Sequence, residues 1–358
     1  MSTENTKFKL GVCGYPLSRG KETGRGLERV IEEFCNFLTR KQISYDFYDK
    51  GIIQSEFVAV LTSFPYLWQL RKASNSCYLA VYAVSGIFPA LLKKRPLVTL
   101  ITDLIPFEVY GYDNWLKYAI KRWCIKYSCL RSDFLIAASS SIKDGIVSRF
   151  GIEPDKVAVV PWGVDLGAYF PDSKVRKIDK RILFLGELKM AKGIDSVIRA
   201  FRLVLEKMPD ATLSIAGSGR DKDDMMKLAA SLLPENSYQF EGFVPEEEMN
   251  ALYNSAELFI FPSRYGFGLS ALEAMACGTP SLVGETLDAK DFFTDKDLFV
   301  NPEDPGQMAE RMLYLLQNRD ARLKKSAQAV TFAQSFSWDH MSEKYLAYCE
   351  QTINSSEV

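Results

Sequence analysis

Histidine is nearly absent from this chain of 358 residues, which contains His340 alone. Metal sites built from histidine and Ser-His-Asp catalytic triads are therefore almost excluded. The seven cysteines form no Cys-x-x-Cys pair. This usage fits a reducing compartment better than a framework of disulfides.

Long apolar runs and low-complexity segments are also missing. No uninterrupted run approaches the ~18–20 residues that a membrane span requires. The first residues, MSTENTKFKL, lack the apolar core of a signal peptide. We therefore expect a cytoplasmic protein.

The bulk composition is that of a globular protein, with 47% hydrophobic and 25% charged residues, and the length suggests two domains. The net charge of −1 hides an imbalance, because Lys and Arg exceed Asp and Glu before residue 170 and the reverse holds after it. Two interpretations remain open. The domains can simply differ in surface charge, or a basic N-terminal half can face an anionic membrane or glycan.

Short apolar runs alternate with helical patterns throughout, which is typical of parallel sheets covered by helices. The pattern predicts an α/β chain made of two Rossmann-like, doubly wound domains. The expected strands are 8–15, 44–49, 77–84, 96–103, 133–140, 157–163, 181–187, 212–218, 238–244, 258–264, 280–285 and 298–302. The clearest helices are 26–41, 193–208, 223–233, 246–256, 269–277 and 305–318.

The charged stretch 171–180, PDSKVRKIDK, reads as a linker between the domains. It divides the chain into an N-terminal domain, 1–170, and a C-terminal domain, 171–335. Residues 336–358 form a final helix that we expect to pack back on the N-terminal domain. Ligands of doubly wound sheets bind at the carboxyl ends of the strands, so we expect the site in the cleft between the domains.

A glycine turn between a strand and a helix marks the first candidate site. Gly266 and Gly268 leave backbone N–H groups accessible at the start of a helix, where the helix dipole favours an anion. Glu273, one to two turns further, can accept hydrogen bonds from two ribose hydroxyls. A plain strand–helix turn with a solvated glutamate is the alternative.

Two further loops follow neighbouring strands. Gly186 ends one strand, and Lys192 and Gly193 come just before the next helix, where a lysine suits a diphosphate. Gly217 and Gly219 follow another strand and permit close approach to the backbone. Taken together, the three loops indicate a site for a nucleotide diphosphate.

These segments resemble the family 4 glycosyltransferases of the GT-B fold. The resemblance is carried by FLGELKMAKGIDSVIRAF (184–201), LSIAGSG (213–219), FEGFVPEEEMNALYNSAELFIFPS (240–263) and GFGLSALEAMACGTP (266–280). In the first half, TDLIP (102–106) and DFLIAASSSIKDGIVSRFGIEPDKVAVVPWGVD (133–165) agree with the family, as does the late FSW (336–338).

The resemblance implies a hexosyltransferase with a nucleotide-diphosphate sugar, UDP- or GDP-linked, as co-substrate. It further implies retention of anomeric configuration, no metal or other cofactor, and a glycan or lipid-linked acceptor in polysaccharide or cell-surface glycan biosynthesis. The implied catalytic residues are Asp103, Thr102 and Lys192. The implied donor-binding residues are Gly24, Arg25, Gly26, Gly186, Lys192, Gly193, Gly217, Phe243, Val244, Tyr265, Gly266, Phe267, Gly268, Leu269 and Glu273.

Three positions depart from the family pattern. Tyr265 stands where the family has a second glutamate, Glu187 where it has an arginine, and Thr102 where it has a histidine. One interpretation is a site retuned for an unusual sugar or acceptor. Another is a degenerate homologue that acts as a binding or partner subunit, and a third is another GT-B activity such as epimerisation or phosphorolysis.

Residues 112–131 interleave aromatic and basic side chains without a nucleic-acid-binding signature. Such a helix can settle on an anionic lipid surface, which would place the protein peripherally at the inner membrane face. Alternatively, its aromatic side chains pack inward. The D-x-D spacing in DKDD (221–224) is typical of metal sites in other transferases, but we interpret these acids as the start of a helix and expect no metal.

Overall fold

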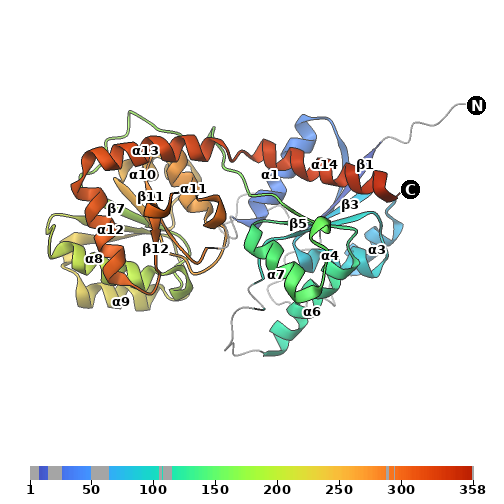
Figure 1. Ribbon diagram of the computed structural model, residues 1–358, viewed down its shortest axis with the longest axis horizontal. Coiled ribbons are helices and arrows are strands. Elements are labelled where there is room, and N and C mark those ends of the chain that lie inside the picture. Colours follow the sequence, from blue (N-terminus) through green and yellow to red (C-terminus); the bar gives the residue numbers. More distant parts are fainter. Residues whose placement is uncertain are drawn as a thin grey trace, which may run out of the picture. The chain divides into compact units, whose positions relative to one another are not determined.

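The chain folds into two compact units, each with its own parallel sheet (Figure 1). The computed structural model describes residues 8–14, 26–49, 64–104, 107, 115–287, 290–293 and 295–356. Unit 1 comprises Met1–Trp162 and Trp338–Val358, and unit 2 comprises Gly163–Ser337. The predicted fold class, two doubly wound α/β domains, is confirmed.

Unit 1 contains a six-stranded sheet in the order β2-β1-β3-β4-β5-β6, with every pair parallel. Leu10 on β1 lies opposite Cys77 on β3, where the strand order reverses. β3 and β4 are completely buried, which explains their largely apolar sequences. The strands are β1 (Lys9–Gly14), β2 (Ser44–Asp49), β3 (Cys77–Val81), β4 (Leu97–Ile101), β5 (Phe134–Ala137) and β6 (Val157–Val159).

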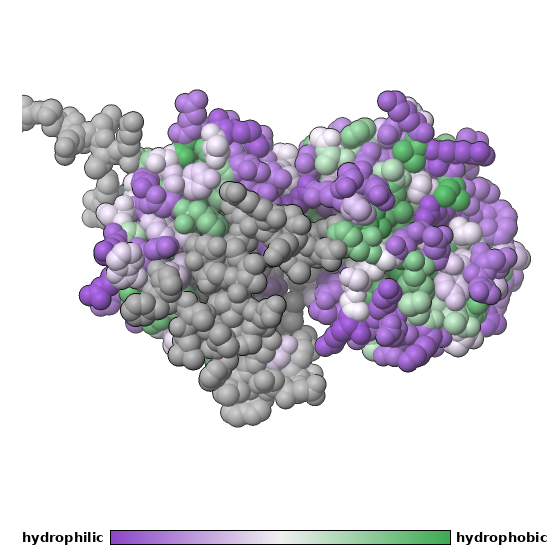
Figure 2. All heavy atoms as spheres, turned by 180° about the vertical axis from the view of Figure 1, so that it is seen from behind, coloured by the Kyte–Doolittle hydropathy of each residue, from purple (hydrophilic) through white to green (hydrophobic). Residues whose placement is uncertain are grey.

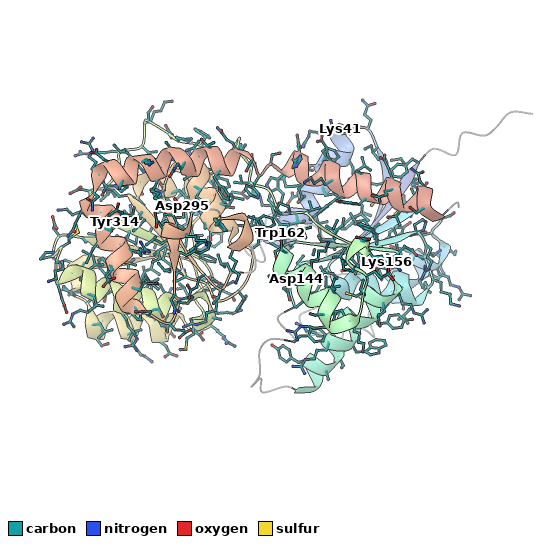
Figure 3. The ribbon with its side chains drawn as sticks, in the orientation of Figure 1. Lys41, Asp144, Lys156, Trp162, Asp295 and Tyr314 are labelled. Atoms are coloured by element: carbon teal, nitrogen blue, oxygen red, sulfur yellow. The ribbon has the colours of Figure 1, made fainter. Side chains whose placement is uncertain are left out.

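Helices cover both faces of this sheet (Figure 1). α3 (Phe64–Lys72), α4 (Ala83–Leu91), α6 (Trp115–Arg131) and α7 (Ser140–Phe150) pack on one face. α1 (Leu27–Arg40) and the final helix α14 (Trp338–Ser356) contact one another on the other face. Two ion pairs join the end of α1 to α14. The Arg40 guanidinium pairs with Asp339, and Lys41 Nζ lies 3.8 Å from Glu343 Oε1 (Lys41 is labelled in Figure 3).

Unit 2 contains the second sheet, in the order β12-β11-β10-β7-β8-β9. This is the Rossmann order, in which the connections reverse direction between β7 and β10. The strands are β7 (Arg181–Leu185), β8 (Thr212–Ala216), β9 (Tyr238–Gly242), β10 (Leu258–Phe261), β11 (Ser281–Gly284) and β12 (Phe299–Val300). All twelve strands predicted from sequence are therefore present, each shorter than or as long as its apolar run.

The helices of unit 2 form two layers (Figure 1). α8 (Ile194–Leu205), α9 (Lys222–Leu232) and α12 (Pro305–Gln317) cover one face of the sheet. α10 (Glu246–Ser255), α11 (Leu269–Ala276) and α13 (Arg319–Gln334) cover the other. The face of unit 2 visible in Figure 2 mixes hydrophilic and hydrophobic side chains, and no helix in the described ranges is long and apolar enough to cross a membrane.

The segment expected to link two domains at 171–180 instead packs within unit 2, and the chain passes between units at 162/163 and 337/338. The Ile178 amide donates to the Ser255 carbonyl at 2.8 Å. Lys177 Nζ donates to the carbonyls of Asn254 at 3.2 Å and Ala256 at 2.8 Å. Lys177 thus binds backbone groups of unit 2, and the boundary that composition predicts at 170/171 lies at 162/163 instead.

Candidate functional site

The candidate site of unit 2 lies where the strand order reverses, at the carboxyl ends of β7 and β10. The two loops that follow these strands are locked together. A Cβ on Gly193, whose φ is 75°, would fall 2.4 Å from the Pro262 carbonyl oxygen. The Arg264 amide donates to the Ala191 carbonyl at 3.1 Å. These contacts fix the loop that carries Lys192 against the glycine turn before α11.

Lys192 reaches the glycine turn directly. It ends a single 3₁₀ turn (Met190–Lys192), and its Nζ lies 4.3 Å from the centroid of the Tyr265 ring. The same atom is 3.6 Å from the position that a Cβ on Gly266 would occupy. Three residues that the sequence predicts for the site, Lys192, Tyr265 and Gly266, are thus brought together.

The turn ends in the N-terminus of α11. Gly266 has a φ of 96°, and Gly268, the N-cap, has a φ of 84°. The Phe267 side chain between them is buried and its ring centroid lies 6.1 Å from that of Phe292. Phe267 therefore anchors the turn, and the backbone of the turn lies at the positive end of the helix dipole, where the sequence predicts that an anion binds. Leu269 is the first residue of α11.

Glu273 is held in place from α10. The Tyr253 hydroxyl donates to Glu273 Oε2 at 2.7 Å. Tyr253 is completely buried, and this burial, reinforced by the charge of Glu273, raises the pKa of the Tyr253 phenol well above its usual range. Tyr253 therefore remains a protonated donor, and it orients a half-buried carboxylate that is predicted to bind ribose.

Arg264 and Asp221 hold the loop that carries Lys192. Arg264 donates to the Met190 carbonyl and lies 3.7 Å from Asp195 in the first turn of α8. Asp221 Oδ2 accepts from the Met190 amide at 2.9 Å. The remaining acids of DKDD, 223 and 224, lie in the first turn of α9, as the sequence predicts.

Glu187, the acid that stands where the family has an arginine, has a cation beside it. Lys189 Nζ lies 2.5 Å from Glu187 Oε1, and both side chains are partly exposed. The ion pair neutralises the negative charge next to the loop. The sequence contains both residues two positions apart, but that spacing does not reveal whether the side chains meet.

The loops after β8 and β9 join the site through backbone contacts. Gly217 has a φ of 122°, and a Cβ there would fall 2.0 Å from the Gly186 carbonyl oxygen. The Gly217 amide donates to the Gly242 carbonyl at 2.7 Å. Phe243, next along the chain, is 44% exposed, and Val244 is half-buried. Both residues come directly after β9, the edge strand of the sheet. The nucleotide base is predicted to bind next to them.

The remaining predicted residues belong to unit 1. Thr102 and Asp103 follow β4, and the Thr102 hydroxyl donates to Asp103 Oδ2 at 3.3 Å. Gly26 is the N-cap of α1. Gly24 and Arg25 lie outside the described residues.

Sequence reasoning missed the role of Tyr253. A tyrosine in an amphipathic helix reads as core, and it is 20 positions from its acceptor. The carbonyl contact of Arg264 was also missed, because an arginine in a loop does not reveal which backbone carbonyl it meets.

Two family matches cover most of the chain. Residues 24–168 match Glycosyltransferase Family 4, and residues 168–331 match Glycosyl transferases group 1. The chain therefore belongs to this family of glycosyltransferases, which are enzymes, and its two doubly wound units constitute the GT-B fold.

Curated relatives agree with this assignment. An uncharacterized glycosyltransferase of Methanocaldococcus jannaschii is 32% identical over 254 residues, which are 66% of this chain and 63% of that protein. The mannosylfructose-phosphate synthase of Agrobacterium fabrum is 29% identical over 357 residues, which are 90% of this chain and 73% of that protein. The chain thus matches less than two thirds of the first relative's length and about three quarters of the second's.

Solved structures show the same fold. Sucrose-phosphate synthase from Thermosynechococcus elongatus superimposes with a TM-score of 0.85 at 16% identity, covering 97% of this chain and 100% of that one. HepE from Anabaena, in complex with UDP and glucose, superimposes with a TM-score of 0.76 at 15% identity, covering 96% and 100%. At these identities the similarity establishes the fold alone.

Proposed function

We propose that this chain transfers a hexosyl group from a nucleotide-diphosphate sugar to a glycan or lipid-linked acceptor, in the cytoplasmic synthesis of a polysaccharide or cell-surface glycan. The observation that carries the proposal is the approach of Lys192 to the glycine turn of α11. Its Nζ lies 3.6 Å from the position of a Cβ on Gly266. A lysine ammonium beside a helix N-terminus provides two sources of positive potential for a diphosphate.

In this proposal the backbone of Gly266 to Leu269 binds the phosphates and Lys192 neutralises them. Glu273, oriented by Tyr253, accepts hydrogen bonds from the ribose hydroxyls, and the base lies near Phe243 and Val244. Since Lys192 and the α11 dipole supply the positive charge, the proposed reaction needs no divalent metal. Activity that persists in EDTA would support this point.

The proposed reaction retains the anomeric configuration. The bond from the anomeric carbon to the diphosphate oxygen breaks, and the acceptor oxygen bonds to that carbon on the same face. The acceptor proton passes to the departing diphosphate oxygen. Lys192 stabilises the charge that develops on this leaving group. Thr102 and Asp103 of unit 1 are proposed to act on the acceptor side.

UDP is the nucleotide favoured for the donor. HepE, which shares the fold of this chain, was solved with UDP and glucose. GDP remains the second choice, because no described side chain discriminates between the bases.

Thermal-shift measurements with UDP, GDP, ADP and their sugar conjugates test the proposal. One nucleotide at about 100 times its dissociation constant should stabilise the wild type by about 2.7 kcal/mol. Glu273→Ala should weaken binding of that nucleotide at least tenfold, because it removes a charged hydrogen-bonding group. Tyr253→Phe, which keeps the packing and removes only the donor, should weaken it about threefold to tenfold.

The matched control is Glu310→Ala, which removes an exposed carboxylate from α12 of the same unit. This variant should bind as tightly as the wild type. If no nucleotide stabilises the wild type, the transferase proposal fails and a partner subunit is the better explanation. Unchanged affinity in Glu273→Ala would instead remove only the ribose assignment.

A further inference from the structure

The outer surface of α6 carries an apolar stripe that no described residue of unit 1 covers. Ile120, Trp123 and Leu130 are 37%, 53% and 52% exposed and lie on one side of the helix, whereas half-buried Tyr127 between them packs against the core of unit 1. We call Ile120, Trp123 and Leu130 the α6 stripe. Each other helix in the described ranges has at most one large apolar side chain exposed to this degree.

The orientation of α6 is fixed by close packing on its opposite side. Ile125 and Ser128 are completely buried, and Cys124 and Cys129 are nearly so. A Cβ on Gly86 of α4 would fall 3.3 Å from Ser128 Oγ, so the two helices pack closely there. The α6 stripe therefore cannot turn inward without unpacking α4 from α6. The alternative expected from sequence, that the aromatic side chains all pack inward, is wrong for Trp123.

The charges on α6 itself have a single sign. The residues of α3, α4, β3, β4 and α6, from Phe64 to Thr102 and from Trp115 to Arg131, include no aspartate or glutamate. Lys126 is exposed beside the stripe, and the Arg131 guanidinium lies 5.5 Å from the Tyr127 ring centroid. The other basic residues of α6 are Lys117, Lys121 and Arg122.

Helices α3 and α4 on the same face of the sheet also expose apolar side chains. The core beneath them joins residues of α3, α4 and α6 in one cluster, so these helices lie on the same face of the sheet. Trp68 of α3 is 55% exposed, with Lys72 Nζ 3.8 Å from the ring centroid, and Leu91 of α4 is 47% exposed. Aromatic and aliphatic side chains flanked by cations are what an anionic bilayer interface attracts.

We propose that the α6 stripe and its flanking cations form a docking surface for an anionic lipid bilayer. The side chains of Trp123 and Leu130 would enter the boundary between headgroups and acyl chains. Lys126 and Arg131 would lie at the level of the anionic headgroups. Such a surface would hold the protein at the membrane that contains the lipid-linked acceptor. The inference rests on the proposed function only for this role, because lipid binding itself does not require transferase activity.

Flotation with vesicles tests the surface without donor or acceptor. Wild-type protein should bind vesicles of phosphatidylglycerol and phosphatidylcholine (1:1) at least tenfold more tightly than vesicles of phosphatidylcholine alone. Raising the salt from about 50 to 500 mM should reduce this preference, because charges at the membrane surface are screened. Trp123→Ser with Leu130→Ser, and separately Lys126→Glu with Arg131→Glu, should each weaken binding at least tenfold.

Matched controls come from unit 2. Tyr314 on α12, labelled in Figure 3, and Leu323 on α13 are 51% and 55% exposed. Tyr314→Ser with Leu323→Ser, and Lys324→Glu on exposed α13, should bind these vesicles like the wild type. A thermal shift with nucleotide shows that each variant is folded, and it reports on the donor site independently of lipid binding.

Three results would overturn the proposal. The first is wild-type protein that does not float with anionic vesicles at low salt. The second is equal loss of binding in the unit 2 controls. The third is a concentration-dependent dimer that the stripe variant abolishes, without lipid binding, since the stripe would then face a second copy of the chain. Nucleotide binding that persists in any of these cases leaves the transferase proposal intact.

Discussion

The ion pair between Glu187 and Lys189 changes what is expected of a position where the family has an arginine and this chain has an acid. Alone, a carboxylate about 4 Å from a phosphate oxygen costs on the order of 1–4 kcal/mol, depending on solvent screening. Lys189 Nζ lies 2.5 Å from Glu187 Oε1, so a positive charge next to the carboxylate opposes that cost. The family position is therefore altered in sequence but balanced in charge.

Lys189→Met should raise the dissociation constant of the nucleotide about fivefold, because it leaves Glu187 uncompensated next to the diphosphate. The double variant Glu187→Gln with Lys189→Met should bind nearly as the wild type does. Isothermal titration calorimetry at low ionic strength measures both. Lys227→Met, which breaks the exposed 3.6 Å pair with Asp224 on α9, is the control. Equal affinity in Lys189→Met and the control would show that Glu187 is too distant to matter.

At the scale of residues, the sequence predicts the groups that would contact the ligand better than it predicts the residues that hold those groups in place. Lys192 and Gly266 are recognisable because glycine and lysine at the ends of parallel strands have a direct physical meaning. Tyr253 is not, because only the tertiary packing of α10 against α11 shows that its hydroxyl meets Glu273. The stacking of Lys192 on Tyr265 is likewise invisible, since an aromatic ring at that position predicts no particular contact.

At the scale of elements, Gly217 and Gly242 offer a matched pair. Both have a positive φ, 122° and 71°, but a Cβ on Gly217 would meet the Gly186 carbonyl oxygen at 2.0 Å, whereas none of the surrounding atoms lies within 4 Å at Gly242. Gly242→Ala should cost about 1–2 kcal/mol from the backbone conformation alone. Gly217→Ala should lower the free energy of unfolding by clearly more than Gly242→Ala does. It should also weaken nucleotide binding, because the loops after β7 and β8 must separate. Urea denaturation and titration calorimetry measure the two effects, and equal losses in both variants would contradict this account.

Strands were the most predictable elements because most of them are short apolar runs that end at glycine or a polar residue. The misread stretch 171–180 shows the limit of that approach. Its lysines and aspartates look solvated, yet Lys177 Nζ donates to two carbonyls of unit 2. Burial also lowers the pKa of Lys177, with the nearby charge of Glu257 opposing this effect. Sequence cannot show which polar residues serve backbone groups.

At the scale of the whole molecule, the chain uses its last helix to complete its first unit. Tyr345 of α14 is completely buried, and its ring centroid lies 5.8 Å from that of Phe34 on α1. Tyr345→Ala should destabilise unit 1 by about 3–5 kcal/mol, the usual cost of removing a buried aromatic ring. Hydrogen exchange should therefore accelerate in β3, β4 and β5, and stay unchanged in β7 and β10.

Tyr314→Ala, at an exposed position of α12, is the control and should leave exchange unchanged in both units. Faster exchange throughout the chain in Tyr345→Ala would mean that the two units unfold as one. Nucleotide added to Tyr345→Ala should still protect β7 and β10, since the residues predicted to bind it belong to unit 2.

Because α14 belongs to unit 1, the two units can complete their folding only in a fixed order during synthesis. Domains generally fold as units in the order in which they leave the ribosome. Here the segment that starts unit 1 emerges first, but the unit lacks α14, which packs beside α1 on one face of the sheet, until Trp338–Val358 follows. Unit 2, Gly163–Ser337, is contained in a single uninterrupted stretch that emerges before that helix. Unit 2, which begins second, is therefore completed first. The face of the unit 1 sheet on which α14 packs stays partly uncovered until the final helix has been synthesised.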